Sequence, residues 1–284
     1  RNYIRYCIWT NDGSTDMSEL NKQSDRLDYL LESFKADSKN YKDIKIPNDE
    51  KEKVRILRSL MNIRMPGRMS EAIIKVQDDY LKECAKEKGI VELSDIATAK
   101  DNISIWQGDI TRLKLDAIVN AANSQMLGCF IPMHTCIDNQ IHTFAGVQLR
   151  DECNRKMKEL RKVYGSSYEQ PTAIPMLTDA YNLPAKKLIH IVGPIVDSGL
   201  TPKKEEELAL CYCNTLDMCL ENGLKSVAFC CISTGVFRFP NRRAAQISTS
   251  TVEKWCTKNP GAMDRIVFNV FKDEDREYYE EFLQ

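Results

Sequence analysis

Apolar residues recur along the chain with two different spacings, and the change between them falls near residue 97. Before that point, apolar side chains lie three and four positions apart, which is the spacing of one face of a helix. This pattern predicts three helices, over residues 25–34, 49–62 and 70–86. The first 23 residues are polar and predict a turn-rich or disordered lead. We therefore expect an N-terminal helical extension over residues 1–97, with packing as its role.

After residue 97, short apolar runs alternate with longer segments of helical spacing. The short runs predict strands at residues 103–107, 117–121, 173–176, 188–192, 226–232 and 266–271. The longer segments predict helices at residues 138–162, 203–221, 241–258 and 274–283. Strands that alternate with helices are typical of an α/β sheet covered by helices on both faces. We expect one such domain over residues 98–284.

Composition and charge narrow the class of protein. The chain has 40 Lys and Arg against 41 Asp and Glu, a net charge of -1, which argues against nucleic acid or an anionic membrane as a partner. The 11 cysteines are odd in number and often lie in apolar runs, as buried free thiols of a reducing compartment do. No apolar run has membrane-spanning length and none resembles a signal peptide. We expect a cytoplasmic protein.

One short segment concentrates residues that bind metals. Cys129, His134 and Cys136 form a Cys-x4-His-x-Cys array. Thiolate and imidazole are ligands that Zn²⁺ prefers, and three protein ligands leave the fourth tetrahedral position open, as in catalytic zinc sites. We expect one zinc ion per chain here, with a chance grouping among the many cysteines as the alternative. Asp138 begins the next predicted helix, where a carboxylate could accept a proton or hold a water molecule.

Polar or small residues follow three of the predicted strands, at residues 108–110, 120–124 and 233–240. In open α/β sheets, ligands bind outside the carboxyl ends of the strands. The Ser-Thr-Gly turn at residues 233–235 precedes a predicted helix, so its backbone N–H groups and open space suit a phosphate or a diphosphate. Each loop alone is also compatible with an ordinary connection.

Taken together, the chain from residue 108 onward resembles the macrodomain family of proteins that bind or hydrolyse ADP-ribose. The matching segments are Gly-Asp-Ile-Thr at 108–111, Asp-Ala-Ile-Val-Asn-Ala-Ala-Asn at 116–123, Ile-His-x-x-Ala-Gly at 141–146, Tyr-Asn-Leu-Pro at 181–184 with His-x-Val-Gly-Pro at 190–194, and Ser-Thr-Gly-Val at 233–236. The resemblance implies a three-layer α/β/α fold with a mixed central sheet.

One departure from the family pattern is informative. Most hydrolytic macrodomains carry a glycine-rich loop before the Ile-His helix, whereas this chain has the Cys/His segment there. In this it resembles the zinc-containing branch of the family, the microbial protein ADP-ribosyl hydrolases. That branch also has a helical extension before the macrodomain, matched here by Leu-Arg-Ser-Leu-Met-Asn-Ile-Arg at residues 57–64.

The resemblance also implies how ADP-ribose would bind. Asp109 would accept a hydrogen bond from the adenine amine, and Ile110 would line the adenine pocket. Phe271 would stack on adenine, with a place in the hydrophobic core as the open alternative. The diphosphate would lie against the backbone N–H groups of Ser233, Thr234, Gly235, Val236 and Phe237.

At the other end of the ligand, Asn123 would hydrogen-bond the distal ribose, while Asp138 and the zinc ion would flank its anomeric carbon. These roles predict a hydrolase that releases ADP-ribose from a mono-ADP-ribosylated protein, with Asn123 and Asp138 as catalytic residues. The alternatives are a reader that binds the modified protein without cleaving it and, third, a macrodomain with a purely structural zinc. His142 is expected to be a hydrogen-bonded core residue rather than a further ligand, and His190 to be structural.

Overall fold

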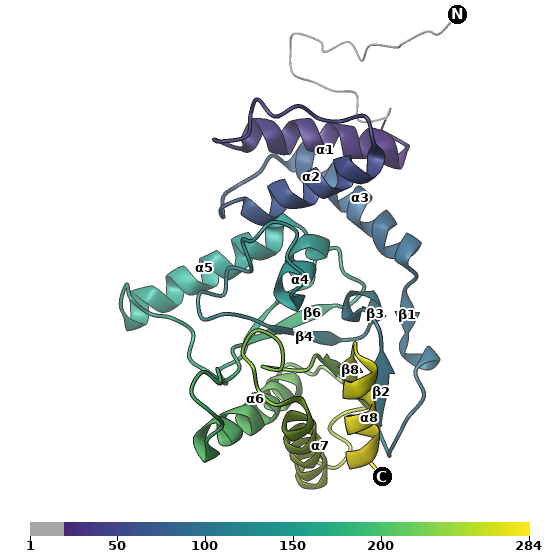
Figure 1. The fold of residues 1–284 in the computed structure, drawn as a ribbon, viewed down its shortest axis with the longest axis vertical. Helices are drawn as coiled ribbons and strands as arrows, with labels where there is room; N and C mark the ends of the chain where they lie inside the picture. The colour runs from purple at the N-terminus through teal and green to yellow at the C-terminus, as the bar shows by residue number, and fades with distance from the viewer. Residues whose placement is uncertain (1–19) are drawn as a thin grey trace, which may run out of the picture.

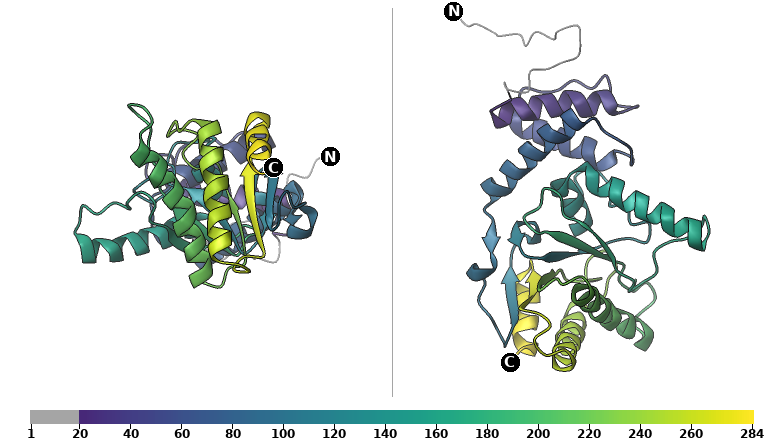
Figure 2. Two further views of the ribbon diagram at one scale, coloured as in Figure 1. Left: turned by 90° about the horizontal axis from the view of Figure 1, so that it is seen from below. Right: turned by 180° about the vertical axis from the view of Figure 1, so that it is seen from behind.

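A central sheet with helices on both faces forms the larger part of the computed structural model, which describes residues 20–284 (Figure 1). One face is covered by α6 (Pro202–Glu221), α7 (Asn241–Lys258) and α8 (Asp273–Phe282), and the other by α4 (Ile137–Ala145) and α5 (Val147–Tyr164). A further helical layer lies outside α4 and α5, as the view from behind also shows (Figure 2). The predicted three-layer α/β/α fold with preceding helices is confirmed.

The main sheet has six strands in the order β2-β8-β7-β4-β6-β5. Their bounds in this order are Ile103–Gln107, Arg265–Val270, Ser226–Phe229, Ala117–Ala121, Lys187–Ile191 and Met176–Asp179. All neighbours are parallel except β5, which runs antiparallel to β6, so the sheet is mixed as predicted. The central strand β7 is buried at every position, because helices cover both faces, and this explains its unbroken apolar run.

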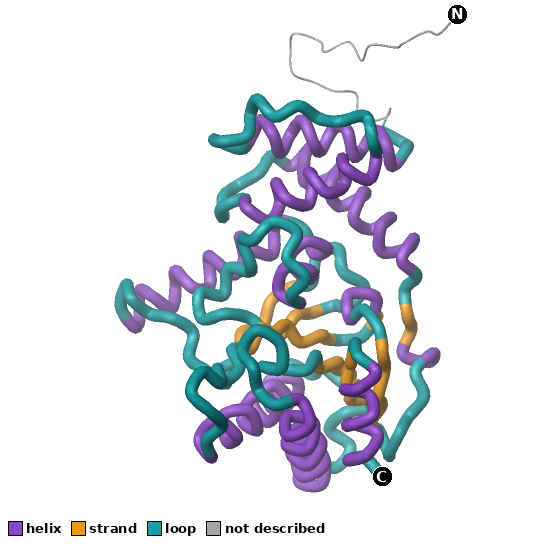
Figure 3. The backbone as a smooth tube through the Cα atoms, viewed as in Figure 1, coloured by secondary structure: helices purple, strands orange, loops and turns teal. Residues whose placement is uncertain are grey.

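Because five of the strands are parallel, they end at the same edge of the sheet, and the loops that follow them there form the candidate site. Figure 3 shows the strands in orange at the centre of this domain and the loops in teal. Two short elements lie beside this edge: the 3-10 helix η3 (Ile110–Arg112) and a small parallel sheet of β1 (Val91–Glu92) and β3 (Leu113–Lys114). A second 3-10 helix, η2 (Leu93–Asp95), follows β1. In the part of the chain that the structure describes, no helix has the length and apolar character needed to cross a membrane.

The outer layer consists of α1 (Gln23–Asp37), α2 (Glu50–Ile63) and α3 (Glu71–Lys88). Its helices share a core of their own, which Val147 of α5 joins. The main buried members are Leu27, Leu30, Leu31, Phe34, Leu57, Leu60, Met61, Val76, Tyr80 and Leu81. Apart from Tyr80, these are positions that the three- and four-residue spacing predicts. The polar lead expected over residues 1–23 lies mostly outside the described residues.

Three predicted elements are wrong in their bounds. The helix expected at residues 138–162 is two helices, because Gly146 has a φ of 99° and a Cβ there would lie 2.7 Å from the side chains of Gln77 and Gln148. The strand expected at residues 173–176 begins only at Met176, since Ala173 has a φ of 65° and Pro175 has no N–H to donate. The strand expected over residues 226–232 also ends early, at Phe229.

Candidate functional site

The loop after β7 presents free backbone donors. Its turn is closed by hydrogen bonds from Arg238 N to Gly235 O (3.0 Å) and from Phe239 N to Ser233 O (2.9 Å). The N–H groups of residues 235–237 make no hydrogen bond to any described residue. Gly235 is exposed, and a Cβ there would meet nothing within 4 Å. Successive free N–H groups of this kind form a concave anion-binding surface.

This loop rests directly on the loop that follows β6. A Cβ on Gly193 would lie 2.1 Å from Ser233 Oγ and 2.7 Å from a side-chain atom of Ile232, so only glycine fits there. A hydrogen bond from Val196 N to Phe237 O (2.8 Å) joins the two loops a few residues further on. The anion-binding loop is therefore held from the side of β6 as well as by its own turn.

Asp109 follows β2, an outermost strand of the sheet, and its side chain caps η3. Its Oδ1 accepts hydrogen bonds from Thr111 N (2.9 Å) and Thr111 Oγ1 (2.6 Å), and its Oδ2 lies 3.2 Å from Lys88 Nζ. Burial alone would raise the pKa of Asp109, but the Thr111 hydrogen bonds and the Lys88 charge outweigh it and lower the pKa. Lys88 comes from α3, so the outer layer reaches this end of the site. This contact was not predicted from the sequence.

The other two residues expected near adenine differ in exposure. Ile110 is 1 % exposed and belongs to the hydrophobic core, so almost none of its surface is open to a ligand. Phe271 follows β8 and is 77 % exposed, which excludes the alternative of a core position. An aromatic ring so exposed beside Asp109's strand is available for stacking.

The three predicted metal ligands converge. Cys129 Sγ, one ring nitrogen of His134 and Cys136 Sγ lie within 4.8 Å of one another, and Cys129 Sγ is 3.6 Å from His134 Nδ1. Zinc bonds of about 2.3 Å to sulfur and about 2.05 Å to nitrogen at the tetrahedral angle require roughly this sulfur-to-nitrogen distance. Burial raises the pKa of Cys136 to about 12, so a bound cation is what would favour its thiolate. The donor set fits zinc.

Asp138 lies in the first turn of α4, directly beyond this loop, and is 5 % exposed. Its Oδ1 accepts a hydrogen bond from Asn120 Nδ2 (2.8 Å). Burial raises the pKa of Asp138 to about 6, against the opposing effects of Asn120 and Arg150. A carboxyl group with a pKa near neutrality is suited to accept and return a proton.

A buried polar chain continues beneath Asp138. Asn120 Nδ2 lies 3.0 Å from His190 Nδ1, and Thr178 Oγ1 lies 2.9 Å from His190 Nε2. His190 is fully buried and both its ring nitrogens are engaged, so its predicted structural role is confirmed. Asn120 was not predicted as a site residue, although an amide within the apolar strand of residues 117–121 indicates a buried hydrogen-bonding role.

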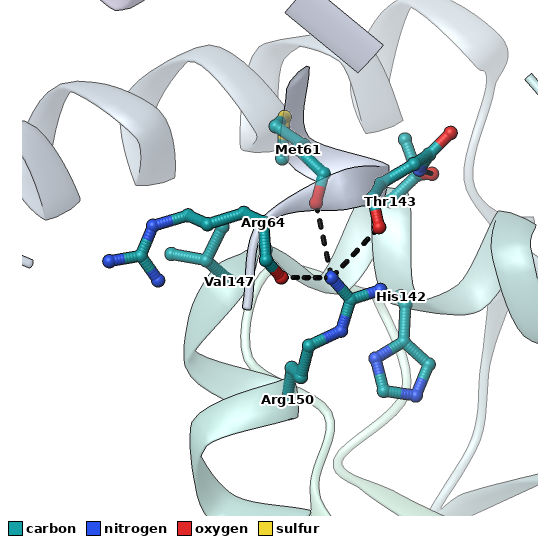
Figure 4. A pocket seen from close by; sticks show the side chains of 8 residues that line it. Met61, Arg64, His142, Thr143, Val147 and Arg150 are labelled. Atoms are coloured by element: carbon teal, nitrogen blue, oxygen red, sulfur yellow. Dashed lines mark hydrogen bonds between the residues drawn. The ribbon is translucent and has the colours of Figure 1, made fainter. Parts of the chain in front are cut away.

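His142 is buried in α4 as predicted, but the expected hydrogen bonds are wrong: Nε2 lies 3.5 Å from Asp138 Oδ1 without forming a hydrogen bond, and neither ring nitrogen has a hydrogen-bond partner among the described residues. The ring packs against Gly128, where a Cβ would lie 2.8 Å from it. It also lines a small cavity of about 10 Å³ among α2, α4 and α5 (Figure 4). One ring nitrogen of His142, Cys153 Sγ and one ring nitrogen of His190 lie within 4.8 Å of one another, but both nitrogens of His190 are already engaged, which argues against a second metal site.

Asn123 follows β4 and supports its own loop. Its Nδ2 donates to Gly128 O (3.2 Å), and its Oδ1 accepts from Gln125 N (3.1 Å). The side chain is half-buried at the sheet edge, so contact with a sugar would be added to these bonds or would replace one of them.

The structure is a three-layer α/β domain in which a loop with free backbone N–H groups and a loop with three potential metal ligands follow strands of the same sheet. The Macro domain family model matches residues 119–248. A protein of Treponema medium named protein-ADP-ribose hydrolase is 48% identical over 265 residues, covering 92% of this chain and 99% of that protein. A protein of the same name from Staphylococcus aureus strain Mu50 is 39% identical, covering 94% of this chain and 98% of that protein. This chain belongs to the macro domain family.

A solved structure gives the same assignment. The Trypanosoma brucei macrodomain in complex with ADP-ribose superposes with a TM-score of 0.61 at 27% identity, covering 80% of this chain and 95% of that one. The larger uncovered part of this chain reflects its greater length.

Proposed function

We propose that this protein is a zinc-dependent hydrolase that removes mono-ADP-ribose from modified protein side chains. Full-length relatives named protein-ADP-ribose hydrolase support the reaction, and a structural neighbour that holds ADP-ribose supports the ligand. The observation that carries the zinc dependence is the convergence of Cys129, His134 and Cys136 next to Asp138.

The order of the strands supports one orientation of the ligand. Along the edge, β2 leads to Asp109, β8 to Phe271, β7 to residues 233–237, and β4 to Asn123 and the metal-binding segment. This is the order adenine, diphosphate, distal ribose. Neighbouring strands are about 4.8 Å apart, so these loops span roughly 14 Å, enough to spread the parts of a dinucleotide-like ligand over separate strands.

The chemical step follows from this placement. When bound, zinc would supply positive charge that orients the distal ribose or an adjacent water and stabilises negative charge there. Asp138 accepts a proton from the attacking water, whose oxygen bonds to the anomeric carbon as the bond to the protein side chain breaks. Asn123 holds the ribose in position. The departing side chain takes up the proton that Asp138 accepted, and the products are free ADP-ribose and the unmodified protein.

The test is release of ADP-ribose from a mono-ADP-ribosylated protein, measured with and without a chelator and again after zinc is added back. We expect release that the chelator abolishes and zinc restores. Binding of the modified protein without release under any metal condition would identify a reader. Release that resists complete removal of the metal would contradict the zinc dependence but not the hydrolase.

The same ligand set bears on the cellular compartment. Zinc binds the thiolate of a cysteine and not its oxidised forms. Cys129 and Cys136 lie close enough that oxidation could link them in a disulfide, so we propose a reducing, cytoplasmic setting. Detection of the protein in a fractionated cell, with its thiols titrated, tests this point.

A further inference from the structure

The outer helical layer contacts the segment that carries the metal ligands, here named the metal loop (residues 129–136). From α2, Arg58 Nη2 donates to the backbone oxygen of His134 (2.8 Å) and to Asn139 Oδ1 (2.8 Å). His134 is itself one of the three ligands. A single guanidinium from the N-terminal layer therefore fixes the backbone of a metal ligand 76 positions further along the chain.

One helical turn after Arg58, Asn62 makes the second contact. Its Oδ1 accepts a hydrogen bond from Met133 N (3.0 Å), and its Nδ2 donates to Thr143 Oγ1 (3.0 Å). Residues four apart lie on the same face of a helix, so both side chains point to the loop. Met133 has a φ of 59°, an unfavourable conformation for a residue other than glycine, and Asn62, which is 2 % exposed, holds it there.

Asn139 connects both ends of the metal loop to Arg58 of α2. Its Nδ2 donates to Ile131 O (2.9 Å) and, more weakly, to Cys129 O (3.4 Å), while its N–H points to Cys136 Sγ (3.4 Å). Its remaining amide oxygen is the one that Arg58 binds. All three ligands of the loop are thus tied, directly or through Asn139, to α2.

We propose that Arg58 and Asn62 are positioning residues for the metal loop: they hold it in the conformation in which its three donors converge. This inference rests on the proposed zinc site but concerns residues outside the macro domain match at residues 119–248. It replaces the expectation that the helical layer serves packing alone. Groups that orient metal ligands in this way typically change metal affinity by 10- to 100-fold when removed.

The experiment measures zinc affinity by competition with a chromogenic chelator for the wild-type protein, Arg58→Met, Arg58→Lys and Arg55→Met. Arg55 lies on the same helix, but its side chain is 62 % exposed and only approaches Glu52, at 3.9 Å, so it is the matched control. We expect Arg58→Met to bind zinc 10- to 100-fold more weakly. Arg58→Lys, which keeps one charged donor, should fall between it and the wild type, and Arg55→Met should match the wild type.

Two further readouts separate positioning from general stability. The thermal unfolding midpoint of the metal-free variants reports the fold without the ion. The absorption bands of the cobalt(II)-substituted proteins report the tetrahedral geometry of the site, which a purely packing role would leave unchanged. If Arg58→Met does not fold, the comparison between Arg58→Lys and Asn62→Leu carries the test.

Equal zinc affinity and equal cobalt spectra in wild type and Arg58 variants would overturn the inference while leaving the zinc site and the proposed function in place. A wild-type protein that binds no zinc in this assay would instead remove the zinc part of the proposed function, and this inference with it. A loss of affinity shared equally by Arg55→Met would also count against a specific clamp.

Discussion

The most direct test of how the ligand lies is the substitution Asp109→Asn. The amide keeps an oxygen that can accept the two hydrogen bonds from Thr111, at 2.9 and 2.6 Å, so the cap of η3 is retained. It places an NH2 group where Oδ2 now lies, and a donor there cannot accept from the adenine amine. The change therefore removes one acceptor from the adenine end, together with the ion pair that Oδ2 makes with Lys88.

The expected loss of ADP-ribose affinity is larger than the expected loss of stability. Losing a hydrogen bond to a charged acceptor costs about 1.5–3 kcal/mol, which is roughly a 10- to 150-fold weaker affinity for ADP-ribose. The ion pair with Lys88 is also lost, but both side chains are about a third exposed, at 30 % and 35 %, so its contribution to stability is under about 1 kcal/mol. The substitution should weaken binding strongly while it changes stability little.

Calorimetric titration with three ligands makes the test specific. ADP-ribose should bind more weakly to Asp109→Asn, whereas ribose 5-phosphate, which has no adenine, should bind both proteins alike. The analogue with hypoxanthine presents an oxygen in place of the amine and should recover affinity in the variant, because its acceptor then meets the new donor. Unchanged affinity for ADP-ribose in a folded variant, or equal losses for all three ligands, would refute the placement of adenine at Asp109.

Three further results are expected. Cys136→Ser should lower the zinc content determined by elemental analysis, whereas His142→Ala should retain it; loss of zinc from a folded His142 variant would mean that the ligand set is wrong. Asp138→Asn should slow release of ADP-ribose by about 10²–10⁴-fold in a single-turnover assay with binding little changed, and a wild-type rate would refute its role as base. Gly193→Ala should lower the free energy of unfolding by about 1–3 kcal/mol in a urea titration, because its Cβ would lie 2.1 Å from Ser233 Oγ, and unchanged stability would contradict that close packing.

The elements of the fold could be predicted because their apolar spacing reflects burial. Ile118 and Val119 are fully buried in β4, and the apolar run that contains them predicts a strand without further information. The break at Gly146 could not be predicted in the same way. The apolar spacing continues across it, and its cause lies in α3, where Gln77 Oε1 accepts a hydrogen bond from Val147 N (3.0 Å).

In the candidate site, too, features set by local sequence could be predicted, whereas features set by contacts between elements could not. The convergence of Cys129, His134 and Cys136 was predictable because they lie within eight positions, so local chain geometry alone brings them near each other. The bonds around them were not, because they depend on side chains from other elements. His142 shows this: its place in a helix follows from sequence, but its unpaired nitrogens depend on how Gly128 and α2 pack against it.

The outer layer shows why polar positions on a helix are harder to interpret than apolar ones. The spacing of Leu57, Leu60 and Met61 identifies the buried face of α2, and a pattern of this kind assigns the remaining positions to solvent. Arg58 and Asn62 lie on the flank of that face and contact the metal loop instead. Polar side chains beside a buried stripe can therefore bind another element rather than water, and a helical extension can support a site to which it contributes no ligand.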